Sequence, residues 1–115
     1  MSVHGFDPAP EAAAAWTPPT SWYTEREFHE LERRAVFGNN WLFAARAEEL
    51  ARPSAFVAAA AAGMTWVTLR HSDLCLRAFH NVCRHHAAEI CRGAGEAAEL
   101  VCPYHGWTYD LDGRL

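Results

Sequence analysis

Two short stretches of the sequence each place a cysteine close to a histidine. Cys83 and His85 are separated by one residue. Further along the chain, Cys102 and His105 are separated by two. A single structural zinc ion usually takes two neighbouring cysteines and two neighbouring histidines. The mixed order in these stretches therefore favours another metal group, with a structural zinc module as the alternative.

A Rieske [2Fe-2S] centre requires this order, because two thiolates hold one of its irons and two imidazoles hold the other. Two loops that each supply one cysteine and one histidine would grip such a cluster from opposite sides. Residues two apart in an extended stretch point to the same face, so Cys83 and His85 can both address it. Gly106 permits a close backbone approach in the second loop. We therefore predict that Cys83, His85, Cys102 and His105 bind a [2Fe-2S] cluster.

The composition excludes several other classes of protein. The 115 residues allow one small domain, and the net charge of -4 leaves no basic stripe for nucleic acid. The longest apolar run, Ala55 to Gly63, is too short to span a membrane. No secretory signal is visible, so the cysteines are expected to be ligands or thiols rather than disulfides. Cys75 and Cys91, which lie outside the two stretches, are expected to be free thiols.

The pattern along the chain predicts an N-terminal arm and then a helix. Residues 1–21 are rich in proline and alanine and are expected to be mobile. Thr24 and Glu27 form a potential capping box for a helix over Glu25 to Phe37, and Gly38 would end it. We divide the chain into the arm, a helical segment over 22–40 and a metal-binding domain over 41–115.

The remainder of the sequence reads as short strands. Residues rich in aromatic and β-branched side chains predict strands over Trp41 to Ala45 and Met64 to Arg70. A polar turn at His71 to Asp73 would join the second of these to a strand over Leu74 to Phe79, forming a hairpin. Asp112 and Gly113 signal another hairpin, whose return strand is apparently truncated.

The stretch FHNVCRHHAAEICRGAGEAAELVCPYHGWTYDLDGRL resembles the N-terminal Rieske domain of the ring-hydroxylating oxygenase alpha subunits. Within that family, PPTSWYTEREFHELE, CRHH and CPYHGWTYDLDG are most similar to the choline monooxygenases. The resemblance runs from about Pro18 to Leu115. It implies a mainly β fold: a Rieske [2Fe-2S] domain of small antiparallel sheets with two cluster-binding loops, preceded by an N-terminal helix.

The resemblance also implies a role in electron transfer. A ferredoxin or flavin reductase would supply electrons, and the acceptor would be a mononuclear Fe(II) in a C-terminal catalytic domain missing from this sequence. That domain would belong to a neighbouring subunit of a homo-oligomer, toward which His105 would face. The reaction would convert choline to betaine aldehyde hydrate, in the cytoplasm or in a chloroplast stroma. No catalytic residue is identified, and no nucleic acid or membrane partner is expected.

Two other functions share these motifs: a stand-alone Rieske ferredoxin and the alpha subunit of an aromatic-ring hydroxylating dioxygenase. The N-terminal helix with its SWYT entry favours an oxygenase subunit over a ferredoxin. His86 is expected at the surface, His71 has no evident partners, and Trp107 is expected to pack near the cluster. Because Trp107 follows Gly106 where a hydroxyl donor could stand, we expect a potential in the lower part of the span of about -150 to +300 mV.

Overall fold

The computed structural model describes residues 6 and 11–115. The chain divides into two compact units, Met1–Trp41 and Leu42–Leu115. Of the predicted arm over 1–21, residues 1–5 and 7–10 lie outside the described residues, and Ala12–Ala14 forms the 3-10 helix η1. Over the residues described, no helix has the length and apolar character needed to cross a membrane.

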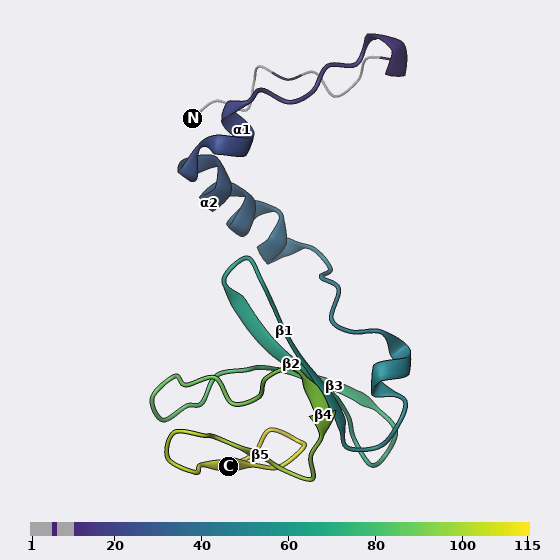
Figure 1. Cartoon of the computed structure of the whole chain (residues 1–115), viewed down its shortest axis with the longest axis vertical. Helices are drawn as coiled ribbons and strands as arrows, with labels where there is room; N and C mark the ends of the chain where they lie inside the picture. The colour runs from purple at the N-terminus through teal and green to yellow at the C-terminus, as the bar shows by residue number, and fades with distance from the viewer. Residues whose placement is uncertain (1–5, 7–10) are drawn as a thin grey trace. The chain divides into compact units, whose positions relative to one another are not determined.

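The first unit contains the short helix α1 (Ser21–Thr24) and the longer helix α2 (Arg26–Ala35), followed by the 3-10 helix η2 (Phe37–Asn39) (Figure 1). The predicted helix is confirmed with shorter ends. Its apolar face includes Phe28, which is buried and stacks on the ring of Trp22 with centroids 4.6 Å apart. This contact holds α1 against α2.

The predicted capping box at Thr24 is wrong. Glu25 is the N-cap residue of α2, with an extended backbone and no side-chain capping bond. Thr24 instead ends α1, where its hydroxyl donates to the carbonyl oxygen of Thr20 at 3.2 Å. Because Thr24 is still the last residue of α1, the N-cap position of α2 falls on Glu25.

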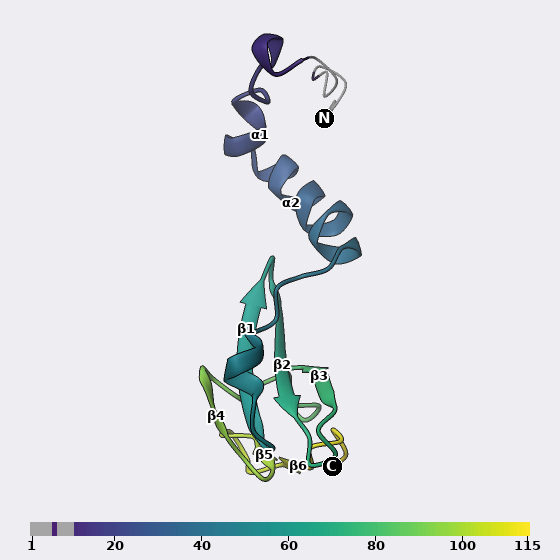
Figure 2. The same ribbon diagram turned by 90° about the vertical axis from the view of Figure 1, so that its right-hand side faces the viewer.

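The second unit is built from antiparallel strands, as the sequence predicted. A four-stranded sheet has the order β3-β2-β1-β4, and β5 pairs with β6 in a second sheet (Figure 2). The 3-10 helix η3 (Ala47–Leu50) precedes the first sheet. The strands are β1 (Ala55–Ala61), β2 (Met64–Arg70), β3 (Leu76–His80), β4 (Ala94–Glu96), β5 (Leu100–Val101) and β6 (Thr108–Tyr109).

The alanine-rich segment forms the inner strand β1 rather than a sheet edge. Its hairpin with β2 turns at Ala62 and Gly63, whose φ values of 51° and 79° are those of a type I′ turn. The register pairs Ala61 with Met64 and Phe56 with Leu69. β4 pairs with the other side of β1 only at Ala55, Phe56 and Val57, so the alanines that follow are paired with β2 alone.

The predicted hairpin of β2 and β3 is confirmed, but β3 begins at Leu76 rather than Leu74. Leu74 has a φ of 67°, and the backbone N–H of Cys75 donates to the side chain of Asp73 at 2.9 Å. These residues therefore belong to the turn. The strand predicted over Trp41 to Ala45 is wrong: these residues have no ladder partner, and Trp41 is fully exposed. Strand propensity alone does not form a strand without pairing.

The core of the second unit joins the large sheet to the loops. Val67 and Leu69 on β2 are completely buried and belong to one cluster with Leu100, Tyr109 and Leu111. Cys83, Cys91 and Cys102 are buried in the same cluster. The thiols of both predicted ligand cysteines are thus anchored in the core, and the loops that follow them extend away from it.

Candidate metal centre

The two predicted ligand loops have the same backbone form. In the first, the N–H of Cys83 donates to Ala88 at 2.8 Å, and the N–H of Ala87 donates back to the carbonyl oxygen of Cys83 at 2.9 Å. In the second, the N–H of Cys102 donates to Trp107 at 2.8 Å, and that of Gly106 donates back to Cys102 at 2.9 Å.

In both loops the residue four positions after the cysteine lies in the left-handed region. The φ value is 56° at Ala87 and 73° at Gly106. Glycine adopts this conformation without cost, whereas alanine accepts some strain. The sequence indicated the second turn through its glycine, but the matching turn in the first loop carries no such signal. Figure 1 shows the two loops extending side by side from the sheets.

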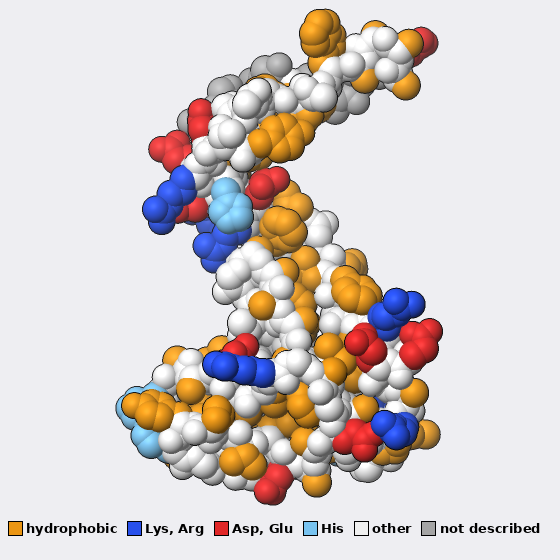
Figure 3. Space-filling view, in the orientation of Figure 1, with side chains coloured by type: hydrophobic (Ala, Val, Ile, Leu, Met, Phe, Trp, Pro, Cys, Tyr) orange, Lys and Arg blue, Asp and Glu red, His pale blue; other side chains and the backbone are white. Residues whose placement is uncertain are grey.

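The loops separate sulfur from nitrogen. Cys83 is 1 % and Cys102 3 % exposed, whereas His85 and His105 are both exposed. The two imidazole rings meet at the surface with their centroids 4.7 Å apart. Figure 3 shows histidine side chains gathered beside a hydrophobic one at this edge of the unit. The two predicted imidazole ligands therefore meet at the surface, while the two predicted thiol ligands are buried in the same core cluster.

Other rings surround the imidazole pair. Trp107 stacks on His85 with an interplanar angle of 2°, and Tyr104 stacks on His105 with centroids 3.8 Å apart. His86 is exposed, as expected, and lies 3.9 Å from the ring of His85. Desolvation, together with the charges of His86 and His105, lowers the pKa of His85. The neutral imidazole, which is the metal-binding form, is therefore favoured at His85.

The structure adds a residue that the sequence analysis missed. Tyr109, at the end of β6, is buried, and its hydroxyl oxygen lies 3.3 Å from Cys83 Sγ. The backbone N–H of Arg84 donates to the same oxygen at 3.1 Å, which leaves the hydroxyl proton free to donate to the sulfur. This contact lowers the pKa of the Cys83 thiol and raises that of Tyr109. The sequence analysis considered a hydroxyl donor only at the position after Gly106, where Trp107 stands, and did not anticipate Tyr109.

A second missed residue is Asn81, which is completely buried two positions before Cys83. Its side-chain oxygen accepts from the N–H groups of Cys91 at 2.9 Å and Ile90 at 3.2 Å. Its amide nitrogen donates to the carbonyl oxygen of Cys91 at 2.7 Å. The Asn81 side chain thereby makes the backbone hydrogen bonds that a neighbouring strand would otherwise make, and it holds the two ends of the first loop together. An asparagine just before a ligand was the only signal in the sequence.

The remaining cysteines are free thiols, as predicted. Cys75 is exposed in the turn before β3, whereas Cys91 is buried in the core. Burial, together with the charge of Glu89, raises the pKa of Cys91. Both thiols lie outside the two loops that carry the predicted ligands.

The donor set fits a cluster of two irons better than a single ion. Two buried thiols can hold one iron in a dry environment, while two surface imidazoles can hold the other. Among the described residues, the group of side chains close enough to share a single ion consists of His85, His86 and His105, and it contains no thiol. The geometry therefore matches the mixed thiolate and imidazole ligation of a Rieske centre.

Comparison with known proteins places the chain among iron-sulfur proteins. Residues 40–115 match the family described as the Rieske [2Fe-2S] domain. The chain is 40 % identical to the chloroplastic choline monooxygenase of Spinacia oleracea over 115 residues, which cover 98 % of this chain and 26 % of the relative. It is 41 % identical to the carnitine monooxygenase oxygenase subunit of Acinetobacter baumannii over 102 residues, which cover 88 % and 28 % respectively.

Solved structures agree with these relatives. The quaternary ammonium Rieske monooxygenase CntA in complex with γ-butyrobetaine superposes with a TM-score of 0.80 at 41 % identity, covering 86 % of this chain and 29 % of that one. Naphthalene 1,2-dioxygenase from Rhodococcus sp. gives a TM-score of 0.75 at 31 % identity, covering 84 % and 22 %. The chain spans about a quarter of the length of the curated relatives it matches.

Proposed function

Because this chain belongs to the Rieske [2Fe-2S] domain family, we propose that it is the electron-transfer domain of a monooxygenase acting on quaternary ammonium compounds. The observation that carries the proposal is the pairing of buried Cys83 and Cys102 with exposed His85 and His105. The thiols would hold the inner iron and the imidazoles the outer one. When bound, the cluster supplies one-electron chemistry.

The residues of this chain would prepare the site in three ways. Asn81 fixes the first loop, and the hydroxyl of Tyr109 stabilises negative charge on Cys83 Sγ. The stacked rings of Trp107 and Tyr104 hold the two imidazoles in place at the surface. Since the imidazoles are the exposed part of the site, electrons would enter and leave on their side.

The domain boundaries that we propose are 1–21 for the N-terminal arm, 22–40 for the helical segment and 41–115 for the Rieske domain.

Anaerobic reconstitution of the chain with iron and sulfide tests the proposal. The product should be red-brown and should show the low average g value that histidine ligation gives to a reduced [2Fe-2S] cluster. Cys102→Ser should abolish the signal, whereas Cys75→Ser should retain it because Cys75 is an exposed free thiol. Stoichiometric zinc without iron would instead support a structural zinc module.

The substrate we propose is a quaternary ammonium alcohol or acid, with choline as the first candidate. The support is the similarity to both choline and carnitine monooxygenases. A ferredoxin or flavin reductase would load the cluster. The acceptor would be a mononuclear Fe(II), held by two histidines and a carboxylate in the catalytic domain of a neighbouring subunit.

An oxygenase subunit that contains this domain together with a catalytic domain, supplied with a reductase, iron and O2, should be tested in parallel with choline, carnitine, γ-butyrobetaine and naphthalene. Aldehyde from choline is expected. Turnover of carnitine or γ-butyrobetaine alone would replace choline by another quaternary ammonium substrate. Turnover of naphthalene alone would contradict the proposal that the substrate is a quaternary ammonium compound. The 115-residue chain by itself is expected to form no aldehyde above the background without protein.

A further inference from the structure

The turn formed by residues 110–114 directly follows Tyr109 and is internally rigid. Asp110 Oδ1 accepts from the N–H of Asp112 at 2.9 Å and from that of Arg114 at 2.8 Å. The backbone of Asp110 also pairs with Arg114 and Gly113 at 2.8 and 3.0 Å. A turn with this many internal hydrogen bonds moves as one body, so a displacement of the turn also displaces Tyr109.

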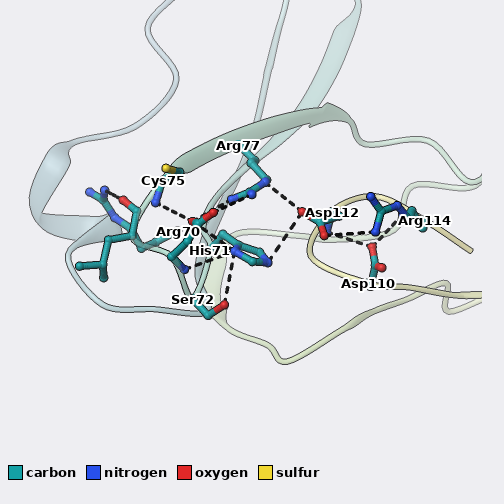
Figure 4. A network of polar contacts seen from close by, with 10 residues as sticks. Arg70, His71, Ser72, Cys75, Arg77, Asp110, Asp112 and Arg114 are labelled. Carbon is teal, nitrogen blue, oxygen red and sulfur yellow. Dashed lines mark hydrogen bonds and ion pairs between the residues drawn. The ribbon is translucent and has the colours of Figure 1, made fainter.

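A charged network fastens this turn to the β2–β3 hairpin (Figure 4). Arg77 on β3 makes a bidentate pair with Asp73 at 3.0 and 2.8 Å, and its Nε lies 3.1 Å from Asp112 Oδ1. His71 was expected to have no partners, but it lies between the same two carboxylates, 3.2 Å from Asp73 and 3.8 Å from Asp112. Bidentate arginine pairs fix geometry as well as charge.

An apolar contact fastens the turn at a second point. A Cβ placed on Gly113 would lie 2.8 Å from the ring of Phe79, also on β3, and the φ of Gly113 is 81°. The turn therefore rests directly on the strand through a position where only glycine fits without strain. Arg77 and Phe79 are two residues apart on β3, so the strand holds the turn by charge and by close packing together.

The space beside Tyr109 makes these fastenings important. A cavity of about 190 Å³ is lined by Val67, Phe79, Tyr109 and Gly113, among others. Tyr109 thus borders an unfilled space as well as the core, and we expect the turn that follows it to help fix the hydroxyl against Cys83 Sγ. Hydrogen bonds weaken steeply when their length and angle are disturbed. A turn released from β3 would let the phenol shift into the cavity and weaken its bond to the sulfur.

We propose that Arg77 and Gly113 are positioning residues that hold the Tyr109 hydroxyl against Cys83 Sγ and so contribute to the reduction potential of the cluster. The inference rests on the proposed function, since it requires the cluster. A hydrogen bond to a ligand sulfur stabilises the more negative, reduced form. We call the contacts of Arg77 with Asp112 and of Gly113 with Phe79 the clamp. Loss of the clamp should therefore lower the reduction potential, as loss of the hydroxyl itself does.

The test is a set of midpoint potentials from film voltammetry on the reconstituted chain. Tyr109→Phe should shift the midpoint downward. Arg77→Gln and Gly113→Ala should each reproduce at least a quarter of that shift. In the Tyr109→Phe background, neither change should shift the midpoint further. Arg92→Gln is the matched control: it removes an equal charge from an exposed pair with Glu89, 3.0 Å apart, that does not contact the turn.

The double variants separate this mechanism from simple charge loss. A long-range effect of the lost arginine charge would persist in the Tyr109→Phe background, and that result would overturn the proposal. Gly113→Ala changes no charge, so an unchanged midpoint in this variant would also overturn it. If Gly113→Ala does not fold, Arg77→Gln and Asp112→Asn replace it: they change the charge in opposite directions, so a midpoint lowered by both reports the lost contact, and midpoints shifted in opposite directions would overturn the proposal. Absence of a [2Fe-2S] signal from the unsubstituted chain would instead refute the proposed function itself.

Discussion

Replacing Asn81 with leucine should destabilise the second unit more than any surface substitution. The two side chains are similar in size, but leucine cannot pair with the backbone of Cys91. Both the N–H and the carbonyl oxygen of Cys91 are bonded to Asn81, and Cys91 is buried. An unsatisfied buried backbone group costs about 1–3 kcal/mol, so two cost about 2–6 kcal/mol. This is a large part of the 5–15 kcal/mol by which domains are typically stable.

Urea unfolding followed by tryptophan fluorescence measures this loss. With a slope of about 2 kcal/mol/M, the midpoint should fall by about 1–3 M. Asn40→Leu is the control, because Asn40 is exposed and donates one bond, to Val36 at 2.7 Å. Its effect should stay within about 0.5 kcal/mol. A midpoint for Asn81→Leu within about 0.3 M of the unsubstituted chain, well inside the shift worked out from the buried groups, would refute the reasoning.

Asn81→Asp gives a pH signature for the same contacts. The new carboxyl group would be buried against the carbonyl oxygen of Cys91 and near Glu89, and we expect these to outweigh the N–H groups of Ile90 and Cys91 and to raise its folded pKa above the unfolded value of about 3.9. Below the folded pKa the carboxyl group is protonated, and it can then donate to the carbonyl oxygen of Cys91 as the amide does. The variant should therefore approach normal stability in acid and lose stability as pH rises through the folded pKa. A deficit that is independent of pH would contradict this account.

Three further predictions concern the core, the clamp and the thiols. Leu69→Ala, at a completely buried position on β2, should cost about 2–5 kcal/mol in urea unfolding. The hydrogen bonds from Arg77 lower the pKa of Asp73, so Asp73→Asn should destabilise at neutral pH. That deficit should vanish as pH falls through the folded pKa, which urea midpoints against pH would show. Iodoacetamide should modify exposed Cys75 first, and buried Cys91, whose pKa is raised, only after unfolding, as peptide mass mapping would show.

The sequence by itself indicated the kind of cofactor and the class of fold. The spacing of Cys83, His85, Cys102 and His105 indicated a Rieske centre because ligand identity is a property of side-chain types and local order. The resemblance to Rieske oxygenase alpha subunits is confirmed by the relatives, and the mainly antiparallel fold is confirmed by the structure. The ligand assignment itself stays a prediction until the cluster is measured.

Local signals were less reliable where their outcome depended on neighbours. Thr24 carried a capping pattern, but its hydroxyl bonds within α1. Trp41 to Ala45 had strand propensity without a strand to pair with. The alanine-rich segment was not predicted as a strand, yet it forms the inner strand β1 because β2 and β4 pair on either side of it. Propensity is a local quantity, whereas a strand or a cap requires a partner.

Only the tertiary structure decided which residues support the ligands. Tyr109 contacts Cys83, which is 26 positions away in the sequence. Arg77 on β3 contacts Asp112 in the turn after β6. Asn81 pairs with Cys91 across a loop. None of these contacts follows from spacing, because each depends on how the strands place distant parts of the chain. The sequence gives the chemical type of each side chain, but the distance between two side chains is set by the packing of the whole domain.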